Sequence, residues 1–280
     1  SSSIYGGAGD DVVIVRDVNK YGLYLDAGSD DDSYYIASSL SGPLTATDSS
    51  GIDFILIDAT SANDVAAISA TEITLNGSTL YSFSSFNNGT LKVTGIEGVN
   101  LDLKDGDDSV SFSGLPTNVA LAVSGGNGAD AFTFNNLPSL YTAGSQYTLH
   151  IYGNLGADTL DVDASLNGTG SLAADTLSAF GLLLPINYYD PEGFTATLTL
   201  SAGDDTLTRY GSLGTWTLDA GTGTDTLIAS GTSNQIYITQ TNGGYIAAED
   251  TVNQFNFNTV ESLLGGSSAD EFIFVEGVVY

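Results

Sequence analysis

The segment GGNGADAFTF, residues 125–134, joins a turn of small residues that ends in an aspartate to a strand of alternating apolar residues. Similar segments occur eight times, and in each an apolar or aromatic residue stands two positions after the aspartate. The aligned aspartates are Asp11, Asp32, Asp108, Asp130, Asp158, Asp205, Asp225 and Asp270. A turn-forming aspartate followed by a period-two strand predicts an all-β fold.

The spacing of these aspartates indicates a stacked architecture. Successive intervals are 21, 76, 22, 28, 47, 20 and 45 residues, so the long gaps are close to two or three short ones. A unit of about 20–28 residues is too short to bury its own apolar face, and it must therefore stack on its neighbours. We expect a parallel β-solenoid with one unit per coil. Repeats of an antiparallel β-sandwich are the alternative.

A longer repeat supports one continuous structure over residues 1–280. The stretch DFILIDATSAN at residues 53–63 resembles DTLIASGTSN at residues 225–234, and a Thr-rich strand follows each. Both blocks then reach a glutamate, Glu97 or Glu261, before an acidic turn closes them. The larger internal repeat therefore covers residues 53–112 and 225–274. The region 164–200 is the least regular part of the chain.

Composition excludes several functions. The formal net charge is -29, from 34 acids against five Lys and Arg. Such a chain repels nucleic acid, whose binding depends on basic side chains. No apolar stretch reaches the ~20 residues of a membrane span, so we expect no membrane insertion. Cysteine is absent, which excludes disulfides and thiol chemistry.

The segments GGAGDDVVI (6–14) and GGNGADAFT (125–133) resemble the Gly-Gly-x-Gly-x-Asp-x-hydrophobic-x nonapeptide of hemolysin-type, or repeats-in-toxin, calcium-binding proteins. The longer block is similar to repeats of very large bacterial surface and extracellular proteins. This resemblance implies a right-handed solenoid, located outside the cell or on its surface, that binds Ca²⁺ through its turns. The motif stands alone about once per coil here, and Asp30 and Ser268 replace one of its glycines.

Simple electrostatics also favours calcium. Coils of a parallel solenoid lie ~4.8 Å apart, so equivalent carboxylates on one edge would repel each other by roughly 1 kcal/mol in water. Ca²⁺ removes this repulsion by binding six to eight oxygens. We therefore expect Ca²⁺ ligands among the turn aspartates. They are Asp10, Asp11, Asp32, Asp107, Asp108, Asp130, Asp158, Asp204, Asp205, Asp225 and Asp270.

We expect a structural or adhesive module of the bacterial surface, a rod or filament subunit stiffened by calcium. Its expected partners are further copies or repeats of itself, and a cell-surface glycan or host surface. A ligand-binding face for glycan or ice is the alternative, and a polysaccharide-active enzyme is the third class. We expect no enzyme, because polysaccharide chemistry needs clustered bases. The basic residues are scattered along the sequence: Arg16, Lys20, Lys92, Lys104, Arg209 and His150.

Overall fold

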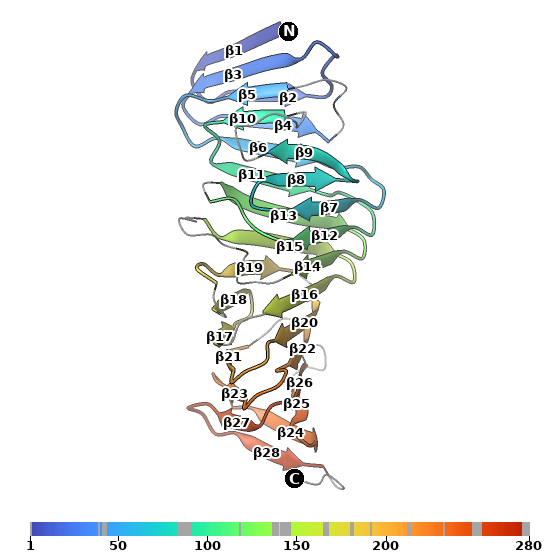
Figure 1. Cartoon of the computed structure of the whole chain (residues 1–280), viewed down its shortest axis with the longest axis vertical. Helices are drawn as coiled ribbons and strands as arrows, with labels where there is room; N and C mark the ends of the chain where they lie inside the picture. The colour runs from blue at the N-terminus through green and yellow to red at the C-terminus, as the bar shows by residue number, and fades with distance from the viewer. Residues whose placement is uncertain are drawn as a thin grey trace.

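The computed structural model is an elongated, all-β molecule with the two chain termini at opposite ends (Figure 1). It describes residues 2–275, except 39, 41–43, 83–90, 118, 136–139, 141–146, 165–167, 180–181, 191, 212–213, 232 and 248–253. The described residues form 28 strands in two large sheets and no helix. No helix long and apolar enough to span a membrane occurs in this part of the chain.

The first sheet has sixteen strands and runs the length of the molecule. In spatial order its strands are β1 (Ser2–Ala8), β3 (Leu23–Ser29), β5 (Leu44–Thr47), β10 (Leu91–Thr94), β9 (Ser78–Ser82), β8 (Glu72–Leu75), β7 (Val65–Ile68), β12 (Ser109–Phe112), β14 (Ala131–Phe134), β16 (Thr159–Ala164), β20 (Thr195–Leu200), β22 (Thr215–Asp219), β26 (Phe255–Asn258), β25 (Gly243–Ala247), β24 (Gln235–Gln240) and β28 (Glu271–Phe274).

The second sheet has twelve strands. In spatial order they are β2 (Val12–Val15), β4 (Ser33–Ala37), β6 (Phe54–Asp58), β11 (Gly98–Asp102), β13 (Ala120–Asn127), β15 (Leu149–Leu155), β19 (Ile186–Tyr189), β18 (Thr176–Ala179), β17 (Thr169–Leu172), β21 (Thr206–Arg209), β23 (Thr226–Ala229) and β27 (Ser262–Gly265).

The chain alternates between the two sheets. Strands β1 to β6 go in turn to the sixteen-stranded and the twelve-stranded sheet, and each pairs in parallel with the strand two places earlier. The same alternation continues through β11 to β16 and β20 to β23. Parallel pairing is therefore the rule, and the all-β prediction is confirmed. The antiparallel sandwich does not describe this arrangement.

Among the described residues, antiparallel pairing occurs at three places where the chain adds a hairpin before it leaves a sheet. These are the pairs β7–β8–β9 and β24–β25–β26 in the sixteen-stranded sheet, and β17–β18–β19 in the twelve-stranded sheet. The third case lies within residues 164–200. The segments 53–112 and 225–274 each contain one hairpin addition and then return to the twelve-stranded sheet, through β11 and β27.

The apolar core lies between the sheets because the strands alternate in burial. Strands β12 and β14 both show an outward, inward, outward, inward pattern. Parallel register then stacks inward residues in rows, and the rings of Phe112 and Phe134 lie parallel with centroids 4.4 Å apart. One inward row contains Val110, Phe132, Leu160, Ala196, Trp216 and Phe255. Burying each large side chain contributes about 1.5–3 kcal/mol.

Two glycines test how tightly the chain packs at its corners, which are the turns where it passes from one sheet to the other. Gly126 has φ +108°, and a Cβ there would overlap the carbonyl oxygen of Lys104 on the adjacent strand. Gly77 has φ +76° in the β8–β9 turn, and a Cβ there would meet nothing within 4 Å. We expect Gly77→Ala to cost about 1–2 kcal/mol, from left-handed backbone strain alone. Gly126→Ala should cost at least about 2 kcal/mol more, because the corners must also separate.

Thermal unfolding of the two variants and the parent chain measures this difference. Gly77→Ala is the control for backbone strain without steric overlap. Equal losses in the two variants would show that the corner at Gly126 is looser than the structure has it.

Candidate metal centre

The motif aspartates connect each repeat to the one before it. Asp130 lies immediately before β14, and its Oδ1 accepts a hydrogen bond from the Asp108 backbone N–H at 2.9 Å. The Asp130 N–H in turn donates to Oδ1 of Asp158 at 2.8 Å. Backbone bonds run the other way, since Ala131 N–H donates to the Asp108 carbonyl at 2.8 Å. Each corner is therefore closed by a side chain and by the main chain.

We call this series of corner hydrogen bonds the aspartate ladder. In every rung a side chain accepts the backbone N–H at the matching position of the preceding repeat. The N–H to acceptor pairs are Asp11 to Asp32, Asp32 to Asp53, Asp53 to Glu97, Asp64 to Asp108, Asp108 to Asp130, Asp130 to Asp158, Gly168 to Asp205, Asp205 to Asp225, Asp225 to Glu261 and Asn234 to Asp270.

The ladder occupies two corners of the molecule. Asp11, Asp32, Asp205 and Asp225 precede strands of the twelve-stranded sheet, whereas Asp108, Asp130, Asp158 and Asp270 precede strands of the other. The motif predicts that these aspartates lie along one edge of the molecule, and the structure places them along two. Six ladder residues lie outside the eight motif aspartates: Asp53, Asp64, Glu97, Gly168, Asn234 and Glu261. The sequence places Glu97 and Glu261 at matching positions of the longer repeat, but it did not single out Asp53 and Asp64 as ladder members. Their signal is an acid two positions before an inward-facing residue.

The first aspartate of each Asp-Asp pair has a different partner. Asp107 is exposed, and its Oδ1 accepts the N–H of Ala129 in the following repeat at 2.9 Å. Asp204 and Asp10 make the same bond, to Thr224 N–H at 2.8 Å and to Asp31 N–H at 3.2 Å. An Asp-Asp pair therefore links its repeat to both neighbours, one in each direction.

The second carboxylate oxygen of the ladder is buried and has no hydrogen-bond donor among the described residues. This holds for Oδ2 of Asp11, Asp32, Asp53, Asp108, Asp130, Asp158, Asp205 and Asp225, and outside the ladder for Oδ2 of Asp190. At Asp130 and Asp158 this oxygen packs against the Cα of Gly125 and Gly153, where any Cβ would overlap it. At these two positions the buried carboxylate therefore requires a glycine. The buried Asp32, Asp108, Asp205 and Asp225 instead have Ala27, Leu103, Leu200 and Ala220 five positions earlier.

Burial of these carboxylates raises their pKa. Desolvation raises the pKa of Asp53, Asp130 and Asp158 to about 6, and neighbouring carboxylates add to the shift. The same cause raises the pKa of Asp32, Asp108, Asp190, Asp205 and Asp225. Asp270 differs, because the side chain of Asn234 donates to it and lowers its pKa. Keeping these buried carboxylates ionised therefore costs free energy.

One group of three carboxylates could bind a metal ion. Asp32 and Asp53 precede β4 and β6, and Asp48 follows β5, so both sheets contribute. One oxygen from each lies within 4.8 Å of the others. Each ionised pair at that distance repels by about 3.5 kcal/mol at an effective dielectric of 20. The Tyr34 hydroxyl approaches the cluster and donates to Asp48 Oδ2 at 2.9 Å.

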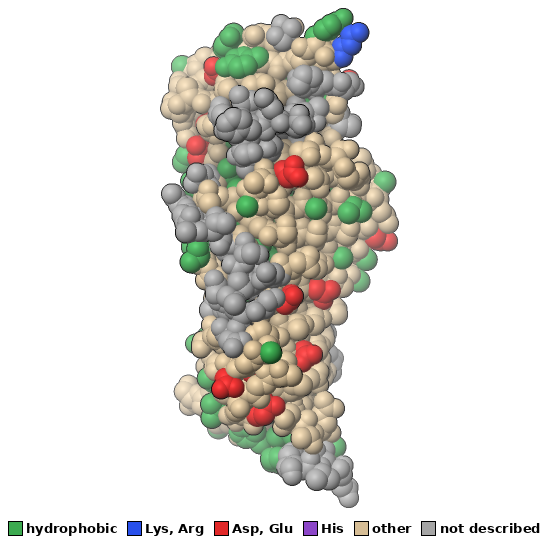
Figure 2. All heavy atoms as spheres, viewed as in Figure 1, with side chains coloured by type: hydrophobic (Ala, Val, Ile, Leu, Met, Phe, Trp, Pro, Cys, Tyr) green, Lys and Arg blue, Asp and Glu red, His purple; other side chains and the backbone are tan. Residues whose placement is uncertain are grey.

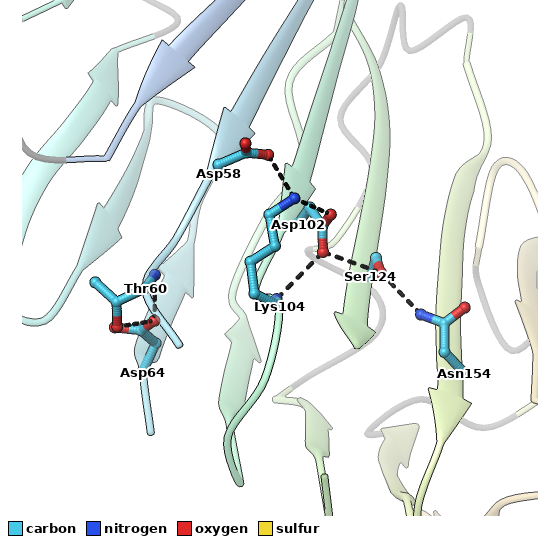
Figure 3. A network of polar contacts seen from close by, with 7 residues as sticks. All are labelled: Asp58, Thr60, Asp64, Asp102, Lys104, Ser124 and Asn154. Carbon is cyan, nitrogen blue, oxygen red and sulfur yellow. Dashed lines mark hydrogen bonds and ion pairs between the residues drawn. The ribbon is translucent and has the colours of Figure 1, made fainter. Parts of the chain in front are cut away.

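Elsewhere the chain neutralises two neighbouring carboxylates with a lysine. Asp58 and Asp102 face each other on adjacent strands β6 and β11. The Lys104 ammonium lies between them, 2.9 Å from Asp58 Oδ1 and 2.7 Å from Asp102 Oδ2 (Figure 3). Ser124 and Asn154 extend this network along the sheet. The acidic cluster has no such ammonium among the ion pairs of the described residues.

Of the eleven expected calcium ligands, only Asp32 belongs to this cluster. Asp10, Asp107 and Asp204 are exposed at the corners, and Asp11 and Asp270 are half-buried. The remaining six are buried in the ladder. Asp48 and Asp53 complete the cluster and were not expected as ligands. The chain matches no protein-family model, and no curated protein matches it.

Asp130 variants separate the hydrogen bond from the charge. Asp130→Ala leaves the buried Asp108 N–H without its acceptor, and we expect it to lower the free energy of unfolding by about 2–3 kcal/mol. Asp130→Asn keeps an acceptor oxygen and removes the buried charge, so it should cost clearly less at pH 7.5. Urea unfolding monitored by circular dichroism measures both. Equal losses would argue that Asp130 is not held as an acceptor.

The raised pKa values predict a pH dependence. The folded chain binds more protons than the unfolded chain between the ordinary aspartate pKa of 3.8 and about 6. The free energy of unfolding should therefore rise as pH falls from 7.5 to 5 in the presence of chelator. Thermal melts across this range measure the slope, and the double variant Asp130→Asn, Asp158→Asn should flatten it. A midpoint that falls on acidification to pH 5 would contradict the buried ladder.

Proposed function

We propose that the chain is a segment of a right-handed parallel β-solenoid that acts as a rigid, acidic structural or adhesive module outside a bacterial cell. The alternation of strands between two parallel sheets supports the solenoid. Crossover connections between parallel strands of one sheet are right-handed in nearly all proteins, which supports the hand. The elongated outline supports a rod (Figure 1).

The aspartate ladder is the observation that carries this proposal. It repeats the same bond at corner after corner, from Asp11 to Asp270. Bending or slipping one repeat past another would break both the side-chain and the main-chain bonds of that corner. A buried carboxylate at each corner therefore stiffens the molecule along its axis. Stiffness of this kind suits a spacer better than a catalyst.

The distribution of basic side chains fits a structural role. Lys104 is bound between two aspartates, and Arg209 is buried with its guanidinium over the Phe255 ring, 5.5 Å from the centroid. Acidic side chains are spread over the face shown in Figure 2, where basic ones occur only near the N-terminal end. These positions offer no cluster of bases for polysaccharide cleavage.

Ca²⁺ is the ion that we propose as the brace of this module. Its preferred ligands are carboxylate and carbonyl oxygens, which the corners supply in excess. The chain has no cysteine and one histidine, so it lacks the soft ligands that zinc prefers. Partial neutralisation of a net charge of -29 would also favour the compact state.

The partners that we propose are further coils of the same kind, from a second copy or from further repeats. Apart from the reversed hairpin strands, the strands of each sheet point in one direction, including the edge strands β1 and β28. Another coil could therefore add in parallel to either edge. A surface glycan or host surface is the partner of an adhesive variant of this role.

A ligand-binding face is the second candidate, and rows of hydroxyl groups favour it. Thr195 pairs with Thr215 and Thr197 with Thr217 on the outward side of β20 and β22. One outward row has six polar residues in succession, namely Ser111, Thr133, Asp161, Thr197, Thr217 and Asn256. A regular polar row of this kind suits a neutral glycan or ice, although Asp161 interrupts it.

Solution scattering tests the rod. Sixteen strands at ~4.8 Å spacing extend about 70 Å before side chains are added. A compact globule of the same length has a radius of gyration of about 19 Å, or a diameter of about 50 Å. We expect a maximum dimension of at least about 75 Å for the isolated chain with and without Ca²⁺. A maximum dimension near 50 Å would exclude a rod.

A further inference from the structure

The acidic cluster of Asp32, Asp48 and Asp53 lies where strands of the two sheets meet. Asp32 and Asp53 are 1% and 0% exposed, and each uses Oδ1 in the aspartate ladder. Their Oδ2 atoms are buried without a donor among the described residues. Asp48 is half-buried and brings a third carboxylate to the same place. Two buried carboxylates, each with an unpartnered oxygen, therefore lie beside a third acid, and one oxygen of each of the three is within 4.8 Å of the others.

Such a convergence needs a positive charge. Carboxylates this close disfavour each other's ionised form, and a proton, an ammonium or a metal ion between them removes that repulsion. At Asp58 and Asp102 the chain supplies the ammonium of Lys104. The cluster lacks an ion pair of this kind in the described part of the chain. The positive charge at the cluster is therefore either a shared proton or a metal ion.

We propose that Asp32, Asp48 and Asp53 together bind one hard divalent cation, Ca²⁺, and that this ion locks the corner between β4, β5 and β6. The proposal rests on the proposed function, because it names the site through which calcium braces the rod. Only oxygen ligands are present. Two oxygens on opposite sides of one Ca²⁺ lie up to about 4.8 Å apart, twice the ~2.4 Å bond length, and the three carboxylates fall within that separation.

Tyr34 fixes the third ligand. Its hydroxyl is buried, accepts the Ala27 N–H at 3.0 Å and lies 2.9 Å from Asp48 Oδ2. The phenol ring is therefore the aromatic group next to the cation. This contact provides a spectroscopic signal, since a terbium ion that replaces Ca²⁺ would be excited through the adjacent tyrosine.

Terbium luminescence and thermal melts test the site with the full chain at pH 7.5. The parent chain should show tyrosine-sensitised emission that Ca²⁺ competes away. Asp48→Asn should weaken Ca²⁺ binding by about tenfold or more, because it removes one of three charged ligands. It should also melt at the same or a higher temperature than the parent in chelator, because it relieves repulsion. The matched control Asp161→Asn changes an exposed aspartate on β16, outside the corners and the cluster, and should bind as the parent does.

Several results would overturn the proposal. One is unchanged Ca²⁺ affinity in Asp48→Asn. Another is a lower melting temperature of that variant in chelator with no loss of binding, which would give Asp48 a structural role only. A third is a parent chain that gains nothing from Ca²⁺ at pH 7.5 and whose stabilisation at pH 5 is larger than that of Asp48→Asn, which would assign the cluster a shared proton. If scattering still shows a rod in that case, the cation site fails and the proposed function stands.

Discussion

The structure depends on one hydrogen bond, in which a corner carboxylate accepts the backbone N–H of the matching residue in the preceding repeat. At these corners the chain leaves one sheet for the other, so the regular strand ladder is interrupted and a buried N–H would lack a partner. The aspartate supplies that partner. Because the short side chain reaches a single N–H, it also fixes the register. A slip by one residue would break the corner and turn the apolar row outward.

The same bond explains the composition of the turn. At Asp130 and Asp158 the carboxylate lies against the Cα of the glycine five residues earlier, Gly125 and Gly153, so a side chain there is excluded. The preceding residue is an aspartate where it can accept from the next repeat, as Asp107 does. Where the motif has this glycine, the glycine thus has a structural cause that requires no metal. Calcium then becomes a question for particular carboxylates rather than for the motif as a whole.

Burying so many carboxylates has an electrostatic cost, and the chain meets it in different ways. Backbone N–H groups stabilise one oxygen of each aspartate that acts as a ladder acceptor. At the partly exposed Asp58 and Asp102 pair the Lys104 ammonium neutralises the charge. At Asp130 and Asp158 the cost persists as a pKa of about 6. At Asp32, Asp48 and Asp53 it is concentrated in one place. Buried corner aspartates therefore form both the stabilising ladder and, where three carboxylates meet, the candidate metal centre.

The sequence by itself determined the all-β class and the aspartates that begin the strands, because turn chemistry and period-two alternation are local. It could not show that Asp108 and Asp205 lie at different corners, since strands of both sheets share the same inward and outward alternation. Only the tertiary structure decided which carboxylates are buried and which meet. Asp48 follows a strand of one sheet and joins Asp32 and Asp53, which precede strands of the other, because crossing between sheets brings these corners together.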